Sequence, residues 1–185
     1  MKKITILLII LFSSGNLLAN SSDSLIKDIK VKYNYIRTNL NSFDTTIIDI
    51  WGESTDGGQQ TAFYENSKLK LIQVIWLGET GKHIIDYYFD KGELIFAFDQ
   101  KFNYNISMYW NEKKIKDNGL KIENQDVFDP KKTRIITDRY YFNNEILFLW
   151  LNNDIKEVDL ESGTNSIVGL GLVSHCHITK SRFNK

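Results

Sequence analysis

One short stretch decides the fold class: Tyr87–Phe98, which reads YYFDKGELIFAF. Two runs of aromatic and aliphatic residues flank the polar residues DKGE, a composition typical of a tight turn between two strands. Further along the chain, Tyr140–Trp150 reads YYFNNEILFLW and repeats the order of paired aromatics, polar turn and apolar run. Each stretch therefore predicts an aromatic β-hairpin.

The same signals recur along most of the chain from Thr45 onwards. The only proline, Pro130, falls in a loop before the penultimate apolar run, so no proline interrupts a continuous antiparallel meander. We therefore predict a meander of six to eight strands made of repeated aromatic hairpins. The runs rich in β-branched and aromatic residues are TTIIDIW, QTAFYE, KLKLIQVIW, HIIDYYF, ELIFAF, TRIITDRYYF and EILFLWL, and the polar turns are ENSK at Glu65–Lys68, DKGE at Asp90–Glu93 and NN at Asn143–Asn144.

A helical pattern precedes the strands. Ser24 stands where a residue can cap a helix that continues to about Leu40. Apolar side chains recur at intervals of three or four and form one stripe, which must lie on the sheet. The predicted fold class is therefore α+β, with an N-terminal helix packed on the meander. The stripe consists of Leu25, Ile29, Tyr33, Ile36 and Leu40.

Residues 1–19 have the pattern of a secretory signal peptide. Lys2 and Lys3 precede an apolar run, Ile4–Phe12, and small and polar residues follow it up to Ala19, after which we predict cleavage. The apolar run is shorter than the roughly 20 residues that span a bilayer, so we expect no stable membrane insertion once the leader is removed. The alternative is an uncleaved anchor. We predict an exported protein, periplasmic or secreted.

The remaining chain suits one domain. We predict a single α+β domain over residues 20–160 and a poorly ordered C-terminal tail over 161–185. Residues 106–128 interrupt the row of hairpins as an insertion with a short helix in YWNEKKIKDNG, for which Gly119 is a C-terminal stop. Removal of the leader takes away two lysines, which leaves 21 of the 23 basic residues against 23 acidic ones. This balance gives no electrostatic reason to expect nucleic acid as a partner.

The second strands of the two quoted hairpins do not alternate. Leu94–Phe98 and Ile146–Leu151 are apolar at every position, which indicates strands covered on both faces. The N-terminal helix can cover only one face of the sheet. The candidates to cover the other face are the insertion 106–128, the segment Ser166–Val173 and a partner outside the chain. The plainest interpretation is that the sheet closes its own core. The functional alternative is an aromatic surface that takes a protein or an apolar small molecule, with Phe96, Phe98, Tyr141, Phe148 and Trp150 as its candidate residues.

Polar side chains with catalytic or metal-binding potential are few. Glu53 and Glu79 lie at equivalent positions in glycine-rich loops and are further candidates for partner binding, without a recognised calcium-loop spacing. His83 begins a strand, and no spacing rule places a nucleophile beside it. His175 and His177 would share one face of a strand, yet the chain offers too few other ligands for a closed zinc site. We expect no metal or other cofactor.

Three functions follow from these residues, in order of preference. The first is an exported, non-catalytic binding module of a bacterial envelope, using the aromatic sheet face or the hairpin loops. The second is an envelope enzyme that uses the loop carboxylates and His83. The third is a structural or assembly role through an open sheet edge.

The single cysteine, Cys176, excludes a disulfide framework within the chain.

One part of the sequence resembles a known repeat family. The segment TDGGQQTAFYENSKLK is similar to MORN-type hairpin repeats, in which an Asp-Gly pair precedes two aromatics and the sequence Glu-Asn-Gly-Lys-Leu; here Ser67 replaces the turn glycine. The resemblance implies hairpin repeats and a role in contacting proteins or membranes, and it supplies no catalytic residues. The matching residues are Asp56, Gly57, Phe63, Tyr64, Glu65, Asn66, Lys68 and Leu69, with Tyr87, Tyr88, Gly92 and Leu94 in a second, less complete copy.

Overall fold

The computed structural model describes residues 14–122 and 126–183. Its centre is one antiparallel sheet of seven strands, and each strand lies beside the next one in the sequence, as a meander requires. The predicted α+β class and strand number are therefore confirmed. The strands are β1 (Asp44–Ile50), β2 (Gly58–Glu65), β3 (Lys68–Gly78), β4 (Gly81–Asp90), β5 (Glu93–Asn103), β6 (Arg134–Asn143) and β7 (Ile146–Leu151).

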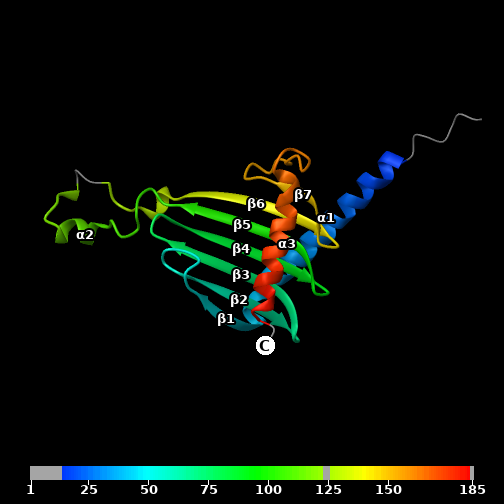
Figure 1. The fold of residues 1–185 in the computed structure, drawn as a ribbon, viewed down its shortest axis with the longest axis horizontal. Coiled ribbons are helices and arrows are strands. Elements are labelled where there is room, and N and C mark those ends of the chain that lie inside the picture. The colour runs from blue at the N-terminus through cyan, green and yellow to red at the C-terminus, as the bar shows by residue number, and fades with distance from the viewer. Residues whose placement is uncertain (1–13, 123–125, 184–185) are drawn as a thin grey trace, which may run out of the picture.

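Two long helices cross opposite faces of this sheet (Figure 1). α1 (Ser14–Asn39) continues into the short 3-10 helix η1 (Leu40–Ser42) and packs its apolar stripe on one face. The predicted N-terminal helix is thus confirmed, although it begins upstream of Ser24 and runs across the expected cleavage point after Ala19. Among the residues that the structure describes, no helix is long and apolar enough to cross a membrane.

The other face is covered by α3 (Asn165–Ser181), where the sequence predicts a poorly ordered tail over 161–185. The structure has a helix there instead, which the sequence does not signal because glycine and β-branched residues lower the intrinsic helix propensity of this segment. Packing on the sheet compensates for the low propensity, since Gly169, Cys176 and Thr179 are buried there. Of the three candidate covers for the second face, the chain uses its own C-terminal segment.

Three of the hairpins, β2–β3, β4–β5 and β6–β7, share the same local geometry. Both central turn residues have a positive φ, as at Asn66 and Ser67 or at Lys91 and Gly92. The pairing register also shifts between two adjacent aromatic residues in each hairpin, as it does between Tyr88 and Phe89. One extra residue is therefore inserted in each second strand, which is a β-bulge.

The bulges explain why the second strands do not alternate. In β5, Tyr88 pairs with Phe96 and Phe89 with Leu94, so Ile95 is the extra residue. Ile95 and Phe96 consequently both pack in the core under α1, while Leu94 and Ala97 pack in the core under α3. Because a helix covers each face of the sheet and the bulge shifts the register of β5, every position of this run faces a core and is apolar.

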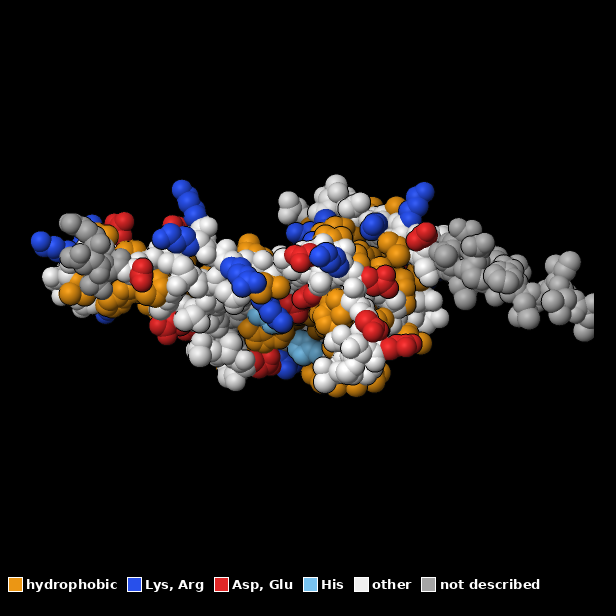
Figure 2. All heavy atoms as spheres, turned by 90° about the horizontal axis from the view of Figure 1, so that it is seen from above, with side chains coloured by type: hydrophobic (Ala, Val, Ile, Leu, Met, Phe, Trp, Pro, Cys, Tyr) orange, Lys and Arg blue, Asp and Glu red, His pale blue; other side chains and the backbone are white. Residues whose placement is uncertain are grey.

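The segment between β5 and β6 projects from the body of the molecule (Figures 1 and 2). It contains α2 (Glu112–Asp117) and the 3-10 helix η3 (Pro130–Lys132). Asn111 caps α2, Gly119 follows it with a φ of 72°, and Ile115 is fully buried inside the arm. Because the arm lies beyond the ends of the strands, it leaves both faces of the sheet to the two long helices.

Candidate functional site

The register of the strands arranges the side chains under α1 in two parallel rows. The first row is aromatic and aliphatic, and the second contains polar and charged side chains together with Phe98 and a terminal Leu151. The helix contacts the first row through Tyr33, which packs on Tyr88 of β4 and Phe96 of β5, and the second row through the ion pair of Arg37 with Asp86 of β4. The first row is Phe63, Leu71, Tyr88, Phe96, Tyr141 and Leu149, and the second is Thr61, Gln73, Asp86, Phe98, Arg139 and Leu151.

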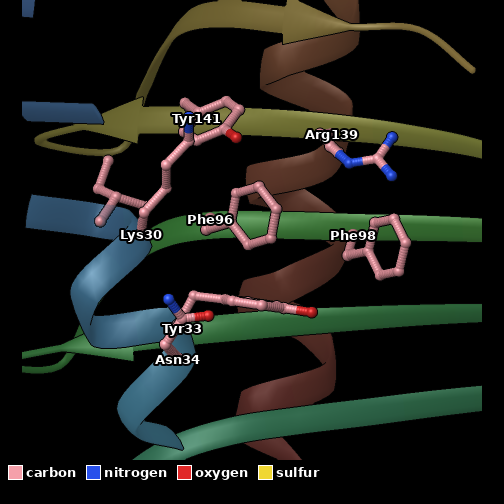
Figure 3. A pocket seen from close by; sticks show the side chains of 8 residues that line it. Lys30, Tyr33, Asn34, Phe96, Phe98, Arg139 and Tyr141 are labelled. Atoms are coloured by element: carbon pink, nitrogen blue, oxygen red, sulfur yellow. The ribbon is translucent and has the colours of Figure 1, made fainter. Parts of the chain in front are cut away.

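A pocket of about 280 Å³ opens where these rows pass under α1. Figure 3 shows three elements contributing to it: α1 on one side, and β5 and β6 beneath. We call this the α1 pocket. Its lining residues are Ile29, Lys30, Tyr33 and Asn34 from α1, Phe96 and Phe98 from β5, and Arg139 and Tyr141 from β6.

Aromatic rings in mutual contact form the floor of the α1 pocket. The Phe96 ring centre lies 4.9 Å from that of Tyr141 and 5.6 Å from that of Tyr33, in tilted and edge-to-face arrangements. Such arrangements are the favourable ones for aromatic pairs. Phe96 and Tyr141 are almost fully buried, so the floor is fixed by packing before any ligand arrives.

Two basic side chains border this floor. The guanidinium of Arg139 lies 5.0 Å from the centre of the Phe98 ring, and its Nη1 donates to the hydroxyl oxygen of Thr137 over 3.2 Å. Lys30 is exposed on α1. Within the described part of the chain, neither cation has a carboxylate in salt-bridge contact.

The one acidic side chain of the second row, Asp86, already has hydrogen-bond and ion-pair partners. Asp86 is buried beside Phe98 in the register and lies 3.5 Å from Nη1 of Arg37. Its carboxylate also accepts a 2.8 Å hydrogen bond from Gln73. Burial raises the pKa of Asp86, while the Gln73 bond and the Arg37 charge oppose that shift. This acid is therefore not available to balance Arg139.

Of the five aromatic candidates from the sequence, the structure places three in this pocket: Phe96, Phe98 and Tyr141. Phe148 lies on the same side of the sheet, with its ring centre 6.4 Å from that of Tyr141, but it does not line the pocket. Trp150 lies on the opposite side, in the core under α3, where its indole N–H donates to Asp138 over 2.8 Å.

Sequence reasoning missed the basic and helical part of the lining. Tyr33 belongs to the predicted helical stripe, which assigns it to the core without indicating a cavity beside it. Arg139 stands two residues before Tyr141 and so shares its strand face, which is the one signal that could have found it. A charged residue on a strand is ordinarily expected to face solvent.

A second group of polar side chains gathers around Trp76 on the α3 side of the sheet. The imidazole of His83 stacks beside the indole with ring centres 5.1 Å apart, and that of His175 lies 5.4 Å away. Glu53 accepts a hydrogen bond from the indole N–H over 3.1 Å. Glu53 and His83 thus meet at one tryptophan, whereas Glu79 lies in the turn between β3 and β4 and contacts the arm through its backbone.

The histidines of this second group are held by hydrogen bonds. His83 Nε2 lies 2.8 Å from a carboxylate oxygen of the nearly buried Asp99, and His175 Nδ1 lies 2.7 Å from the hydroxyl of Tyr87. Desolvation lowers the pKa of His175, so its neutral form is favoured. Arg182 lies 2.8 Å from Glu53 and, with the indole N–H, lowers the pKa of that carboxyl.

His175 and His177 do not form the pair that the sequence predicts. They lie on a helix, where two residues subtend about 200° and side chains two apart diverge. His175 faces the sheet, while His177 is exposed and lies 2.9 Å from Glu145. Among the described residues, no group of three histidine, cysteine or acidic side chains is placed to hold a metal ion.

Comparison with known proteins adds no relative. No protein-family model, curated protein or solved structure matches this chain. The functional argument therefore rests on the geometry of the two clusters.

Proposed function

We propose that this protein is a non-catalytic binding module and that the α1 pocket takes a small molecule with an apolar body. The observation that supports this most is the convergence of Phe96, Phe98 and Tyr141 with Tyr33 around one opening. Aromatic walls with a few polar groups are the usual lining of small-molecule sites.

The size of the α1 pocket favours a small ligand over a protein segment. Ligand pockets commonly measure about 300–1,000 Å³, so 280 Å³ lies just below that range. The contacts among Tyr33, Phe96 and Tyr141 also hold the floor in place. A preformed site of this kind loses little free energy to ordering when a ligand enters.

We also propose that the module works outside the cytoplasm, in the periplasm or as a secreted protein. This proposal rests on the leader pattern of residues 1–19, of which residues 1–13 lie outside the described part of the chain. A binding role is what the resemblance to MORN-type hairpins implies as well.

The test uses the neutral fluorescent probe N-phenyl-1-naphthylamine, titrated into the protein that starts at residue 20. We expect saturable binding, and we expect Phe98→Ala to weaken it about tenfold because the probe loses one aromatic wall. Phe102→Ala is the matched control, since Phe102 lies on the same strand but outside the pocket. Equal affinities for the two variants, or no saturable binding at all, would reject the proposed site.

A second candidate function has one specific observation in its favour. The buried Asp99 orients His83, whose side chain is 35% exposed, and Glu53 lies at the same tryptophan. A carboxylate-held imidazole is the arrangement of a general base. The enzyme alternative therefore retains His83 and Glu53 as its candidate catalytic residues and no longer includes Glu79. Hydrolysis of p-nitrophenyl acetate at the same rate by the wild type and by His83→Ala would dismiss it.

A further inference from the structure

The α1 pocket has an unbalanced positive charge beside its aromatic floor. Arg139 is fixed by Phe98 and by the Thr137 hydroxyl, neither of which carries a negative charge. In Figure 3, Lys30 reaches from α1 and Arg139 from β6, with the Phe96 ring between them. No carboxylate among the described residues lies within salt-bridge distance of either cation.

The neighbouring ion pair makes this imbalance more pronounced. Asp86 is the acid of the same row, yet its carboxylate faces Arg37, Gln73 and Tyr88. Arg37 and Asp86 together contribute no net charge when both are ionised. Arg139 and Lys30 then remain as two uncompensated positive charges at the edge of a partly buried apolar site.

A guanidinium held in this way is suited to an anionic ligand group. Its planar set of N–H donors matches a carboxylate with two parallel hydrogen bonds. Partial burial strengthens the attraction between opposite charges because water screens it less than at an open surface. The fixed position of the Arg139 side chain also lowers the entropy lost when the contact forms.

From these observations we infer that the ligand is a small amphipathic anion, with an aromatic or short aliphatic body on the ring floor and a carboxylate at Arg139. This inference rests on the proposed function of the α1 pocket and specifies the chemical class that the pocket selects. Lys30 adds to the positive potential from the opposite side of the opening. Arg139 is then the residue that determines the preference for an acid over a neutral molecule of the same shape.

The test compares two probes that differ only at the polar end: 4-phenylbutanoate and 4-phenylbutan-1-ol. Each is used to displace N-phenyl-1-naphthylamine from the protein beginning at residue 20. For the wild type we expect the acid to bind at least about tenfold more tightly than the alcohol. Raising the salt concentration should reduce this ratio, since screening weakens the contact.

Substitutions assign the preference to one side chain. Arg139→Gln should remove the preference for the acid by lowering the acid affinity far more than the alcohol affinity, while Arg139→Lys should retain most of that preference. Arg134→Gln is the matched control: Arg134 lies on the same strand, is exposed, and does not line the pocket. Lys30→Gln should lower the acid affinity by a smaller factor than Arg139→Gln.

The outcomes separate this inference from the proposed function. If both probes displace the dye equally and Arg139→Gln alters neither affinity, the anion preference is refuted while the apolar pocket stands. If neither probe displaces the dye and the dye itself does not saturate, the binding site is refuted as well. An unfolded Arg139→Gln variant would be recognised by circular dichroism, and Arg139→Lys with the salt series would then decide the question.

Discussion

A hydrogen bond of 2.7 Å joins Nδ1 of His175 on α3 to the hydroxyl oxygen of Tyr87 on β4. Tyr87 is 1% exposed, so the bond lies in the interface between the helix and the sheet. The neutral tautomer with its proton on Nε2 accepts the Tyr87 hydroxyl proton at Nδ1, whereas a protonated ring can only donate from that atom. Docking of α3 is therefore coupled to the protonation of one imidazole.

This coupling predicts a loss of stability on mild acidification. Desolvation lowers the pKa of folded His175 below its usual 6.5, the Arg182 and His83 charges act in the same direction, and the Glu53 charge opposes them. The unfolded chain consequently binds the proton first. The free energy of unfolding should fall as pH drops below about 6.5 and continue falling down to the depressed folded pKa.

Urea unfolding of the wild type and of His175→Gln between pH 7.5 and 5.5 measures the effect. The glutamine side chain is uncharged and does not titrate, so the free energy of unfolding of this variant should change less over this interval. His177→Gln is the control, because His177 is exposed on the same helix and should leave the wild-type slope in place. Identical slopes for the wild type and His175→Gln would contradict the prediction.

Two glycines of α3 have opposite structural roles. A Cβ atom built on Gly169 would lie 2.6 Å from Cβ of Leu147, whereas one on Gly171 meets nothing within 4 Å. Gly169→Ala should therefore force α3 away from β7 and lower the free energy of unfolding by about 1–3 kcal/mol. Gly171→Ala should raise it by about 0.5–1 kcal/mol, since alanine is the better helix former.

Thermal denaturation of the two variants tests this assignment directly. The two substitutions are chemically identical and lie two positions apart on one helix, so any difference arises from packing. If both variants were stabilised, the close approach of α3 to β7 would be wrong. If both were destabilised, the outward position of Gly171 would be wrong.

The contrast between α1 and α3 shows which parts of this fold can be read from the sequence. The stripe of α1 is made of Leu, Ile and Tyr, so its helical period is visible. The side of α3 that faces the sheet also carries Val168, Leu172 and Val173, but the buried Gly169, Cys176 and Thr179 interrupt that apolar stripe and make its helical period harder to recognise. The strands were predictable because β-branched and aromatic residues fill them between polar turns.

The candidate site was predictable only where the alternation of a strand is regular. Phe96 and Phe98 are two apart on β5 and do share the α1 pocket. Phe148 and Trp150 are also two apart, yet the bulge at the paired aromatics of β6 places them on opposite sides of the sheet. Arg139 joins the pocket through pairing of β5 with β6 across the projecting arm, and no local pattern reports that pairing.

Trp150 provides a test of this separation between the two faces. Its indole packs against Tyr140 with ring centres 5.2 Å apart and bonds to Asp138. Trp150→Ala should lower the free energy of unfolding by about 3–5 kcal/mol, through the cavity and the loss of the hydrogen bond. The folded variant should bind N-phenyl-1-naphthylamine with wild-type affinity, because Trp150 lies away from the α1 pocket.

The matched control for this substitution is Trp51→Ala. Trp51 is 81% exposed, so its removal should alter the stability by less than about 0.5 kcal/mol. Equal losses in the two variants would mean that Trp150 is not part of the core under α3. Loss of dye binding in a folded Trp150→Ala protein would instead connect the two sides of the sheet.

The buried thiol of Cys176 reports how often α3 leaves the sheet. Its side chain is 0% exposed, and burial raises its pKa to about 12, which suppresses the reactive thiolate. Reaction with 5,5′-dithiobis(2-nitrobenzoate) at pH 8 should be at least about a hundredfold slower in the folded protein than in urea. The rate that remains measures opening of the helix.

An exposed cysteine on the same helix completes the experiment. Ser174→Cys, made together with Cys176→Ala, places a thiol on the exposed side of α3 and should react at nearly the unfolded rate. If Cys176 in the wild type reacted as fast as this variant, α3 would be undocked for most of the time and the second face of the sheet would be open. A slow reaction that accelerates in Gly169→Ala, but not in Gly171→Ala, would assign the protection of Cys176 to the close contact between α3 and β7.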